Sequence, residues 1–213
     1  CRIFNKPCPP AGPSNRCLRQ KISEHLTADI YDPKFNYFDG YWQNEKYFID
    51  IREELLETFK IADTSSVSCR RYTEMINRKN AVSIHIRRGD YAENPKIKKI
   101  HGVLSRNYYS EAIRLIKQHE PEPAFFFFSD DIEWCKLNLS ESGVFVEKTS
   151  ALEDIYLMSL CKHNIIANSS FSWWGAWLNE HSDKMVVAPR QWFADTGLNE
   201  IAREICPDRW HRI

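Results

Sequence analysis

Two adjacent arginines, Arg87 and Arg88, follow directly after a short apolar segment of the chain. A guanidinium group keeps its charge at every working pH and can hold two phosphate oxygens at once. Residues 81–86 alternate apolar with small or polar types, which predicts a buried strand that ends at the arginines. Such a pair favours a diphosphate ligand, and Gly89 lets the backbone turn beneath it. The alternative is a solvated surface pair, with His85 as an ordinary core histidine.

Polar residues also follow two later apolar segments. Asp130 and Asp131 stand after residues 124–128, and Asn168-Ser169-Ser170 stands after residues 164–167. Hydroxyls and free backbone N–H groups in the first turn of a helix attract anions, so the serines favour a phosphate site. These residues have a second interpretation, because Asp and Ser are also common N-cap residues of helices.

Composition and charge exclude several classes of protein. The 29 Lys and Arg residues balance 29 Asp and Glu residues, so no overall positive charge attracts nucleic acid. With 43% hydrophobic residues among 213, the chain has material for one large or two small globular domains. Its longest purely apolar run, residues 124–128, is far shorter than the roughly 20 residues that cross a bilayer. We therefore expect a cytoplasmic protein, with peripheral association at the inner membrane face left open.

The cysteines do not indicate a metal site. The seven cysteines show no Cys-x-x-Cys pattern, and no pair of histidines stands beside them at ligand spacing. Cysteines within predicted helices favour a reducing compartment, whereas a disulfide among Cys1, Cys8 and Cys17 is left open. Because the chain begins with Cys1 and not with Met, we expect its natural start to lie upstream.

The periodicity of the apolar residues predicts how the motifs are positioned. Asn44 is the expected N-cap of a helix to about Lys60, and a second helix is expected near residues 73–78. From Ala81 onward strands alternate with helices, which predicts parallel βαβ units in a Rossmann-like sandwich. Ligands bind beyond the carboxyl ends of the strands in such sheets, where all three polar stretches then lie. The expected strands are residues 81–86, 124–128, 144–146, 164–167 and 185–188, with a polar loop to Gly102, a helix at 107–118, a helix capped by Asp130, and helices that follow Ser150 and Ser170.

Aromatic residues form two groups whose role the sequence leaves open. Tyr41 and Trp42 belong to a cluster that either lines a sugar pocket or fills the core, and core is the more frequent meaning. The same choice holds for Trp173, Trp174 and Trp177, of which we expect at least one to be buried.

The stretch His85-x-Arg-Arg-x-Asp90, with those around Ser129 and Ser170, resembles the α-1,2-fucosyltransferase family, glycosyltransferase family 11. The resemblance covers most of residues 37–193 and includes the segment 40–48. It implies transfer of L-fucose from GDP-β-L-fucose to the 2-hydroxyl of a β-galactoside, in an oligosaccharide or a lipid-linked glycan, with inversion.

The resemblance also implies an α/β, GT-B-like fold. Residues 81–213 would form the C-terminal Rossmann-like donor domain that binds GDP-fucose. Residues 1–80 would form a partial N-terminal acceptor-side domain, because the Gly-rich start of that domain in the family has no counterpart here. Either that start lies outside the sequence, or the protein is an incomplete relative.

The resemblance assigns roles to the first two polar stretches. Arg87 would grip the β-phosphate and stabilise the departing GDP, which supplies transition-state electrostatics without a metal. His85, Arg88 and Asp130 are further candidates for donor binding. No Asp-x-Asp pattern of a divalent-metal site is present, so neither metal nor another cofactor is expected.

The acceptor hydroxyl needs to lose its proton, and two carboxylates follow the arginine pair. Asp90 and Glu93 are the candidate catalytic bases. The alternative is a loose, oxocarbenium-like transition state in which leaving-group departure dominates and no strong base is required.

Asp154 stands sixteen positions before Ser170, a spacing that the wider fucosyltransferase superfamily shares. There the aspartate reads guanine and the serine binds the β-phosphate. A carboxylate suits guanine because it offers two oxygens to the N1–H and N2–H donors. The other interpretation of Asp154 is a helix-dipole partner beside the capping residue Glu153. Ser169 and Phe171 complete the expected donor-binding stretch.

Other functions remain open at this level. The enzyme could form another linkage or use another acceptor, because a donor domain does not specify the acceptor. The chain could also bind GDP or a glycan without turnover. A role of the basic segment Lys96 to Lys99 in binding nucleic acid or lipid is less favoured than a solvated loop.

Overall fold

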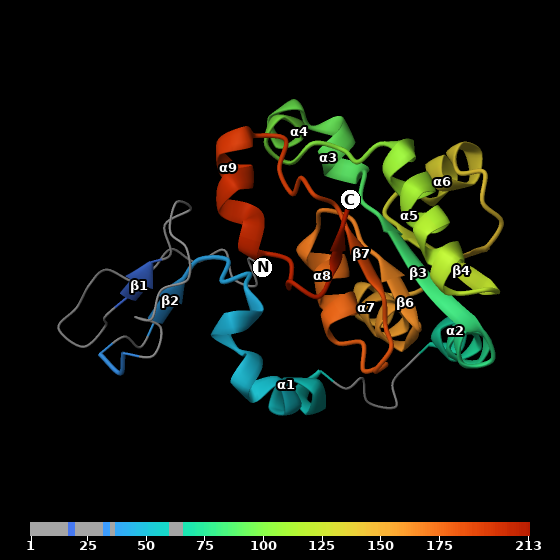
Figure 1. The fold of residues 1–213 in the computed structure, drawn as a ribbon, viewed down its shortest axis with the longest axis horizontal. Coiled ribbons are helices and arrows are strands. Elements are labelled where there is room, and N and C mark those ends of the chain that lie inside the picture. Colours follow the sequence, from blue (N-terminus) through green and yellow to red (C-terminus); the bar gives the residue numbers. More distant parts are fainter. Residues whose placement is uncertain (1–16, 20–31, 35–36, 60–65) are drawn as a thin grey trace.

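The computed structural model describes residues 17–19, 32–34, 37–59 and 66–213. Its centre is a six-stranded sheet in the order β5-β4-β3-β6-β7-β8, and every neighbouring pair is parallel (Figure 1). The predicted parallel α/β class is therefore confirmed. The strands are β3 (Asn80–Ile86), β4 (Pro123–Ser129), β5 (Val144–Phe145), β6 (His163–Ile165), β7 (Val186–Ala188) and β8 (His211–Arg212).

The strand order changes direction beside β3. From β3 the chain first builds outward through β4 to β5, and then returns to place β6 on the other side of β3. The registers place Ser129 of β4 opposite Ile86, and Asn164 of β6 opposite Ser83. This is the order of dinucleotide-binding Rossmann folds, where ligands bind at the switch between the two halves. The loops after β3 and β6 flank that switch.

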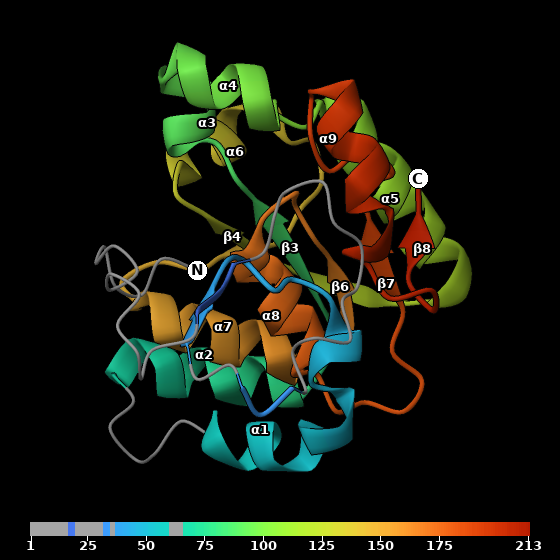
Figure 2. The same cartoon turned by 90° about the vertical axis from the view of Figure 1, so that its left-hand side faces the viewer.

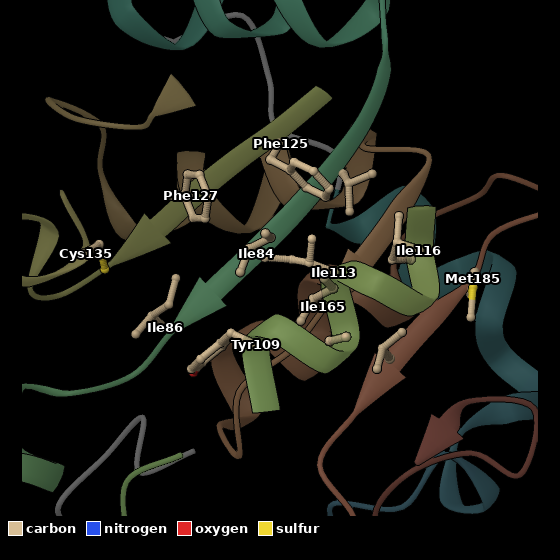
Figure 3. Close-up of a cluster of buried hydrophobic side chains, with 13 residues drawn as sticks. Ile84, Ile86, Tyr109, Ile113, Ile116, Phe125, Phe127, Cys135, Ile165 and Met185 are labelled. Carbon is tan, nitrogen blue, oxygen red and sulfur yellow. The ribbon is translucent and has the colours of Figure 1, made fainter. Parts of the chain in front are cut away.

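Helices cover both faces of the sheet, which explains its apolar strands. Figure 3 shows Ile113 and Ile116 of α5 (Arg106–His119) against Ile84 and Ile165 of the strands. The intervening residues of the strands face the opposite layer, where Phe126 packs with α2 (Val67–Asn77) and α7 (Ala151–Leu160). The period of two in β3 and β4 thus divides their side chains between two clusters of the core.

The helix α7 is held at its start by a capping box. The Ser150 side chain accepts from the Glu153 backbone, and the Glu153 carboxylate accepts from the Ser150 N–H at 2.7 Å. The other carboxylate oxygen of Glu153 accepts from the Ser66 N–H at 2.5 Å, before α2. These hydrogen bonds lower the pKa of Glu153 to about 2 and tie α2 to α7.

The N-terminal helices differ from the expectation. Asn44 is an N-cap as predicted, but it opens a 3-10 turn (Glu45–Tyr47), followed by a second one (Ile49–Ile51) and by α1 (Arg52–Thr58). The predicted apolar face is only partly buried, since Phe59 remains 50% exposed. The second helix, α2, begins at Val67, earlier than predicted, because Ser66 caps it.

The prediction of a polar loop between β3 and Gly102 is wrong. This segment contains α3 (Gly89–Glu93) and α4 (Pro95–His101), which lie together near the carboxyl ends of the strands (Figure 2). The Asn94 side chain accepts from the Lys96 N–H and caps α4, and Pro95 occupies the first turn. This cap and proline pattern was the available signal for a helix.

Other helices and strands begin at a different residue than predicted or were not predicted. Asp131, not Asp130, caps α6 (Ile132–Asn138), because the Asp130 carboxylate bonds elsewhere. The sequence also did not predict α9 (Thr196–Ile201), the 3-10 turn η4 (Ala202–Glu204) or β8. A small parallel pair joins β1 (Cys17–Arg19) to β2 (Tyr37–Asp39).

Residues before the expected boundary at residue 80 pack on the sheet's helices. Phe48 stacks on Trp174 with ring centroids 5.4 Å apart, and the Trp177 indole donates to Glu45 at 2.9 Å. Both tryptophans belong to α8 (Ser170–Trp177). The division into domains at residue 80, and the GT-B arrangement, remain predictions. Cys1 and Cys8 lie outside the described residues, so the open disulfide question is not tested.

In the part of the chain that the structure describes, every helix is either too short or too polar to cross a membrane.

Candidate functional site

The loops after β3 and β4 meet through Arg87. Its guanidinium contacts Asp90 at 2.7 Å and Asp130 at 2.9 Å. The contact follows from the sheet, because β3 and β4 pair in register up to Ile86 and Ser129, so the residues that follow emerge side by side. The guanidinium also lies 5.3 Å from the ring centre of Tyr91. The first polar stretch and the second are therefore brought together.

Arg88 makes a different set of contacts. Its backbone N–H donates to Asp130 at 2.8 Å, while its Nε donates to Asp131 at 3.3 Å. Its guanidinium lies 3.9 Å from the ring centre of Trp134. The paired and stacked Arg88 side chain thus secures the loop against α6, and Arg87 is the arginine that is more exposed.

Gly89 makes room for the carboxylate that joins the two arginines. A Cβ atom at this position would lie 2.6 Å from Oδ2 of Asp130, which is closer than van der Waals contact permits. The glycine predicted to sit beneath a ligand therefore sits against Asp130.

His85 lies beneath this loop and is 4% exposed. Burial, followed by the nearby positive charge of Arg87, lowers the pKa of His85 to about 3, so its ring is neutral at pH 7. The ring tilts against that of Phe171 at a centroid distance of 5.3 Å. Within the described residues, Nδ1 of His85 is buried without a hydrogen-bond partner. A neutral, buried ring supports the loop by packing and adds no positive charge for a phosphate.

The loop after β6 is fixed by the amide of Asn168. This amide donates to the carbonyl oxygens of His101 at 2.8 Å and Trp192 at 3.1 Å. The Tyr91 hydroxyl in turn donates to the Asn168 carbonyl at 3.4 Å. The third polar stretch is thereby tied to α3 and α4, next to the arginine loop.

The serines of this stretch open α8. Ser169 is the N-cap, and its hydroxyl accepts from the Phe171 N–H at 3.3 Å. Ser170 is the first helical residue and is half-buried. The capping interpretation therefore holds for Ser169, while Ser170 faces open space.

Ser170 lines a cavity of about 660 Å³ between the N-terminal segment and the helices α7 and α8. Several of its lining residues are aromatic, and aromatic faces suit the apolar faces of sugar rings. Trp173 lines the cavity but is 1% exposed, and Trp177, outside the lining, is 0% exposed, which confirms that both are core residues. Besides Trp173, the aromatic lining residues are Tyr41, Trp42, Phe48, Phe59, Tyr156 and Trp174.

Asp154 lies in the first turn of α7, the helix that packs against α8. Its Oδ1 accepts from the Thr149 hydroxyl at 2.6 Å. Burial, with a smaller contribution from the charge of Glu153, raises the pKa of Asp154 to about 6. Glu93, which like Asp90 is a candidate catalytic base, is exposed at the end of α3.

The sequence did not predict the role of three aromatic rings beside the arginine loop. Tyr91 and His101 stack with centroids 4.7 Å apart, and burial lowers the pKa of His101. Trp134 was placed in a helix but not connected with Arg88. Only the position of Tyr91 next to the motif gave a signal, because His101 and Trp134 approach through tertiary packing.

In the arginine loop, the carboxylates outnumber the arginines by one. Three carboxylates, of Asp90, Asp130 and Asp131, contact the two guanidinium groups of Arg87 and Arg88. The two terminal nitrogens of Arg87, Nη1 and Nη2, each contact a carboxylate oxygen. Asp90 is the more exposed of its two partners, at 44% against 27% for Asp130.

The amino-acid sequence of the chain is similar to those of known glycosyltransferases. The family described as Glycosyl transferase family 11 matches residues 20–212. The chain is 40% identical to an alpha-1,2-colitosyltransferase of Escherichia coli, over 90% of this chain and 69% of that protein. It is also 40% identical to the O-antigen biosynthesis glycosyltransferase WbnK of Escherichia coli, over 78% of this chain and 58% of that protein.

More distant relatives and a solved structure complete the comparison. The identity to the mouse galactoside 2-alpha-L-fucosyltransferase Sec1 is 28%, over 66% of this chain and 41% of that protein. A solved beta Kdo 2,7 transferase, KpsC of Thermosulfurimonas dismutans, aligns with a TM-score of 0.33 and 15% identity over 65% of this chain and 46% of that one. That likeness is too low to bear on the fold. From the match over residues 20–212 and the 40% identities, the chain belongs to glycosyltransferase family 11.

Proposed function

We propose that this glycosyltransferase moves L-fucose from GDP-β-L-fucose to the 2-hydroxyl of a galactoside, with inversion and without a metal ion. The observation that carries the proposal is Arg87, held by Asp90 and Asp130 at the carboxyl end of β3. That position, beside the switch to β6, is where Rossmann-like sheets bind nucleotides.

The reaction needs a group that stabilises the leaving diphosphate. The bond between fucose C1 and the β-phosphate oxygen breaks, and a new bond forms from the acceptor oxygen to the opposite face of C1. Arg87 neutralises the charge that develops on GDP, with Ser170 at the start of α8 as a second donor to the phosphate. Because an arginine supplies this charge, the reaction is expected to proceed in EDTA.

The acceptor proton leaves to a carboxylate in this proposal. When the diphosphate takes the place of Asp90 on Arg87, that exposed carboxylate becomes available as a base. Glu93, exposed in the same helix, is the other candidate. The aromatic cavity beside Ser170 is the proposed acceptor side, since its walls suit a galactoside ring.

A second candidate is transfer of a colitosyl group in place of fucosyl. It is favoured by the 40% identity to the colitosyltransferase, against 28% to the mouse fucosyltransferase. The same Arg87 chemistry serves both donors. The chain spans 69% of the colitosyltransferase, 58% of WbnK and 41% of the mouse fucosyltransferase. Donor and acceptor are therefore proposals for the whole protein.

A thermal-shift titration in EDTA tests donor binding without an acceptor, because a ligand of the folded state raises the melting temperature. We expect shifts with GDP, GDP-fucose or the corresponding colitosyl nucleotide, and none with UDP-galactose. Arg87→Ala should lose the shift, whereas Arg114→Ala, which changes an exposed arginine of α5, should keep it.

Transfer to a β-galactoside acceptor then separates enzyme from binding module. Product with an α-1,2 linkage supports the proposal, and a different linkage overturns that part of it. A shift with GDP but neither transfer nor donor hydrolysis would mean a GDP-binding relative without turnover. Absence of any nucleotide shift would contradict the donor site itself.

A further inference from the structure

A second pocket lies away from the site just described, between the 3-10 turn η4 and the carboxyl ends of β7 and β8. Its volume is about 390 Å³. Three arginines line it: Arg190 after β7, Arg203 in η4 and Arg212 in β8. We call it the arginine pocket. Its remaining lining residues are Pro189, Trp192, Asn199, Ala202 and Cys206.

Two of the arginines are held in place by backbone carbonyl groups. Nη2 of Arg190 donates to the carbonyl of Arg212 at 3.3 Å, and Nη1 of Arg212 donates to the carbonyl of Arg203 at 2.9 Å. These bonds orient the side chains of Arg190 and Arg212, and all three arginines are exposed. A carbonyl group is neutral, so it leaves the charge of each guanidinium uncompensated.

The arginine pocket differs from the other arginine clusters in lacking carboxylates. Arg209 nearby is paired with Glu45 through two contacts, at 2.5 and 2.7 Å. Among the residues that the structure describes, Arg190, Arg203 and Arg212 form no ion pair. Glu204 follows Arg203 directly, but its carboxylate accepts from the Asn44 amide and lies 3.8 Å from the Lys46 ammonium.

The floor of the pocket adds no negative charge. Cys206 is buried, and burial raises the pKa of its thiol to about 12, although the charge of Arg212 opposes the shift. The Asn199 amide oxygen is already used, because it accepts from the N–H groups of Trp192 and Phe193 at 2.7 and 3.3 Å. Among the described residues, no carboxylate therefore offsets the positive charges of the pocket.

We propose that the arginine pocket binds the phosphate or diphosphate group of a ligand other than the sugar nucleotide. Guanidinium groups match phosphate oxygens in geometry and charge, and the three exposed arginines can reach a ligand at the pocket. The pocket opens at the same edge of the sheet as Arg87, but on the last strands of the order and not at the switch beside β3. The phosphate could belong to a lipid headgroup or to a soluble phosphorylated molecule.

Calorimetric titration with inorganic pyrophosphate tests the binding. The experiment uses the full chain carrying Arg87→Ala, so that the donor site does not contribute. We expect binding in this background, and a loss of about tenfold or more in affinity when Arg203→Gln and Arg212→Gln are added. Matched control changes are Arg71→Gln and Arg114→Gln, which remove the same charge from exposed helix positions.

Sedimentation with vesicles distinguishes the two sources of phosphate. Binding to vesicles that contain one quarter phosphatidylglycerol, but not to pure phosphatidylcholine, would assign a lipid headgroup if the Arg203 and Arg212 changes abolish it. Pyrophosphate binding without vesicle binding would assign a soluble ligand. Equal pyrophosphate affinity in the Arg203/Arg212 and Arg71/Arg114 variants, or no binding at millimolar concentration, would overturn the proposal. Far-UV circular dichroism confirms that each variant is folded.

Discussion

Two groups of arginines lie at the same edge of the sheet and are treated differently by their surroundings. Arg87 and Arg88 contact three carboxylates at distances from 2.7 to 3.3 Å. In the arginine pocket, the Arg212 side chain donates to a backbone carbonyl, and no acidic side chain among the described residues pairs with Arg203 or Arg212. The first group has one more carboxylate than arginine, whereas in the second no carboxylate of the described residues offsets the arginines.

This difference suits the two groups to different roles. Arginines held by carboxylates can position a phosphate, and arginines without carboxylates can attract one. Carboxylates hold Arg87 in one orientation, and a reaction that depends on where charge develops needs that orientation. Uncompensated arginines attract any phosphate but fix its position less closely. We infer that the first group serves chemistry and the second serves binding, and the following experiments can break that distinction.

The largest expected effect is the loss of transfer in Arg87→Ala. We expect kcat/KM to fall by about 10²- to 10³-fold, because the main partner of the leaving diphosphate is removed. Arg203→Gln, at the other group, should change it by no more than about twofold. Steady-state transfer assays measure both. Equal losses in the two variants would contradict the distinction.

The next effect comes from the carboxylate that orients Arg87. Asp130→Asn keeps an oxygen for the Arg88 N–H but removes the charge beside Arg87, so kcat/KM should fall by about 10- to 100-fold. Gly89→Ala should act in the same direction, since its Cβ would lie 2.6 Å from Asp130.

Gly197→Ala in α9 is the matched control for the glycine change. A Cβ atom there would meet its nearest neighbour at 3.4 Å, an ordinary contact, so activity should be unchanged. Full activity in both Asp130→Asn and Gly89→Ala would show that Arg87 needs no fixed orientation.

A smaller effect is expected from pH through Asp154, whose pKa is about 6. Only the ionised carboxylate accepts both guanine N–H groups, so GDP affinity should fall about tenfold for each pH unit below 6. The effect of pH on folding has the opposite sign. The Asp154 carboxyl binds its proton more tightly in the folded state than in the unfolded state. The contribution of Asp154 to the free energy of unfolding therefore decreases as pH rises from about 4 to 6.

Titrations of GDP and inosine diphosphate between pH 5 and 8 measure the Asp154 effect. Inosine diphosphate lacks the 2-amino group, so its affinity should depend less on Asp154. Asp154→Asn should give a flat profile for both nucleotides. A wild-type profile that is equally flat would remove Asp154 from the donor site.

The smallest effect is expected from a change that gives the arginine pocket a carboxylate, as the loop of Arg87 and Arg88 has. Asn199→Asp keeps the oxygen that accepts from Trp192 and Phe193 and places a carboxylate among the three arginines. Pyrophosphate binding should weaken, and the free energy of unfolding should rise by about 0.5 to 1 kcal/mol. Thermal denaturation measures the gain, which should vanish when Arg203→Gln and Arg212→Gln are also present.

Much of the sheet could be predicted from the sequence. The strands β3 and β4 carry long apolar runs, and helices such as α5 show a clear apolar face, so their types and approximate bounds were correct. Short elements were not. The strand β8 has two exposed residues, and its pairing partner β7 lies more than twenty positions earlier, so no local pattern marks it.

The candidate site was predicted in its residues but not in their partners. The motif around Arg87 and the serines before α8 were correctly placed at the carboxyl ends of strands. Which carboxylate meets which arginine depends on side-chain directions after β3 and β4, as does the stacking of Arg88 on Trp134. Sequence spacing contains no information on those directions.

The sequence by itself determined the parallel sheet, the edge at which its polar loops gather and the family. Hydrophobic periodicity and local motifs are sufficient for these, because each depends on residues close together in the chain. Only the tertiary structure decided that Arg87 is paired, and that Arg190, Arg203 and Arg212 meet no carboxylate among the described residues. Electrostatic interactions act between side chains that folding brings within a few ångströms, however far apart they stand in the sequence.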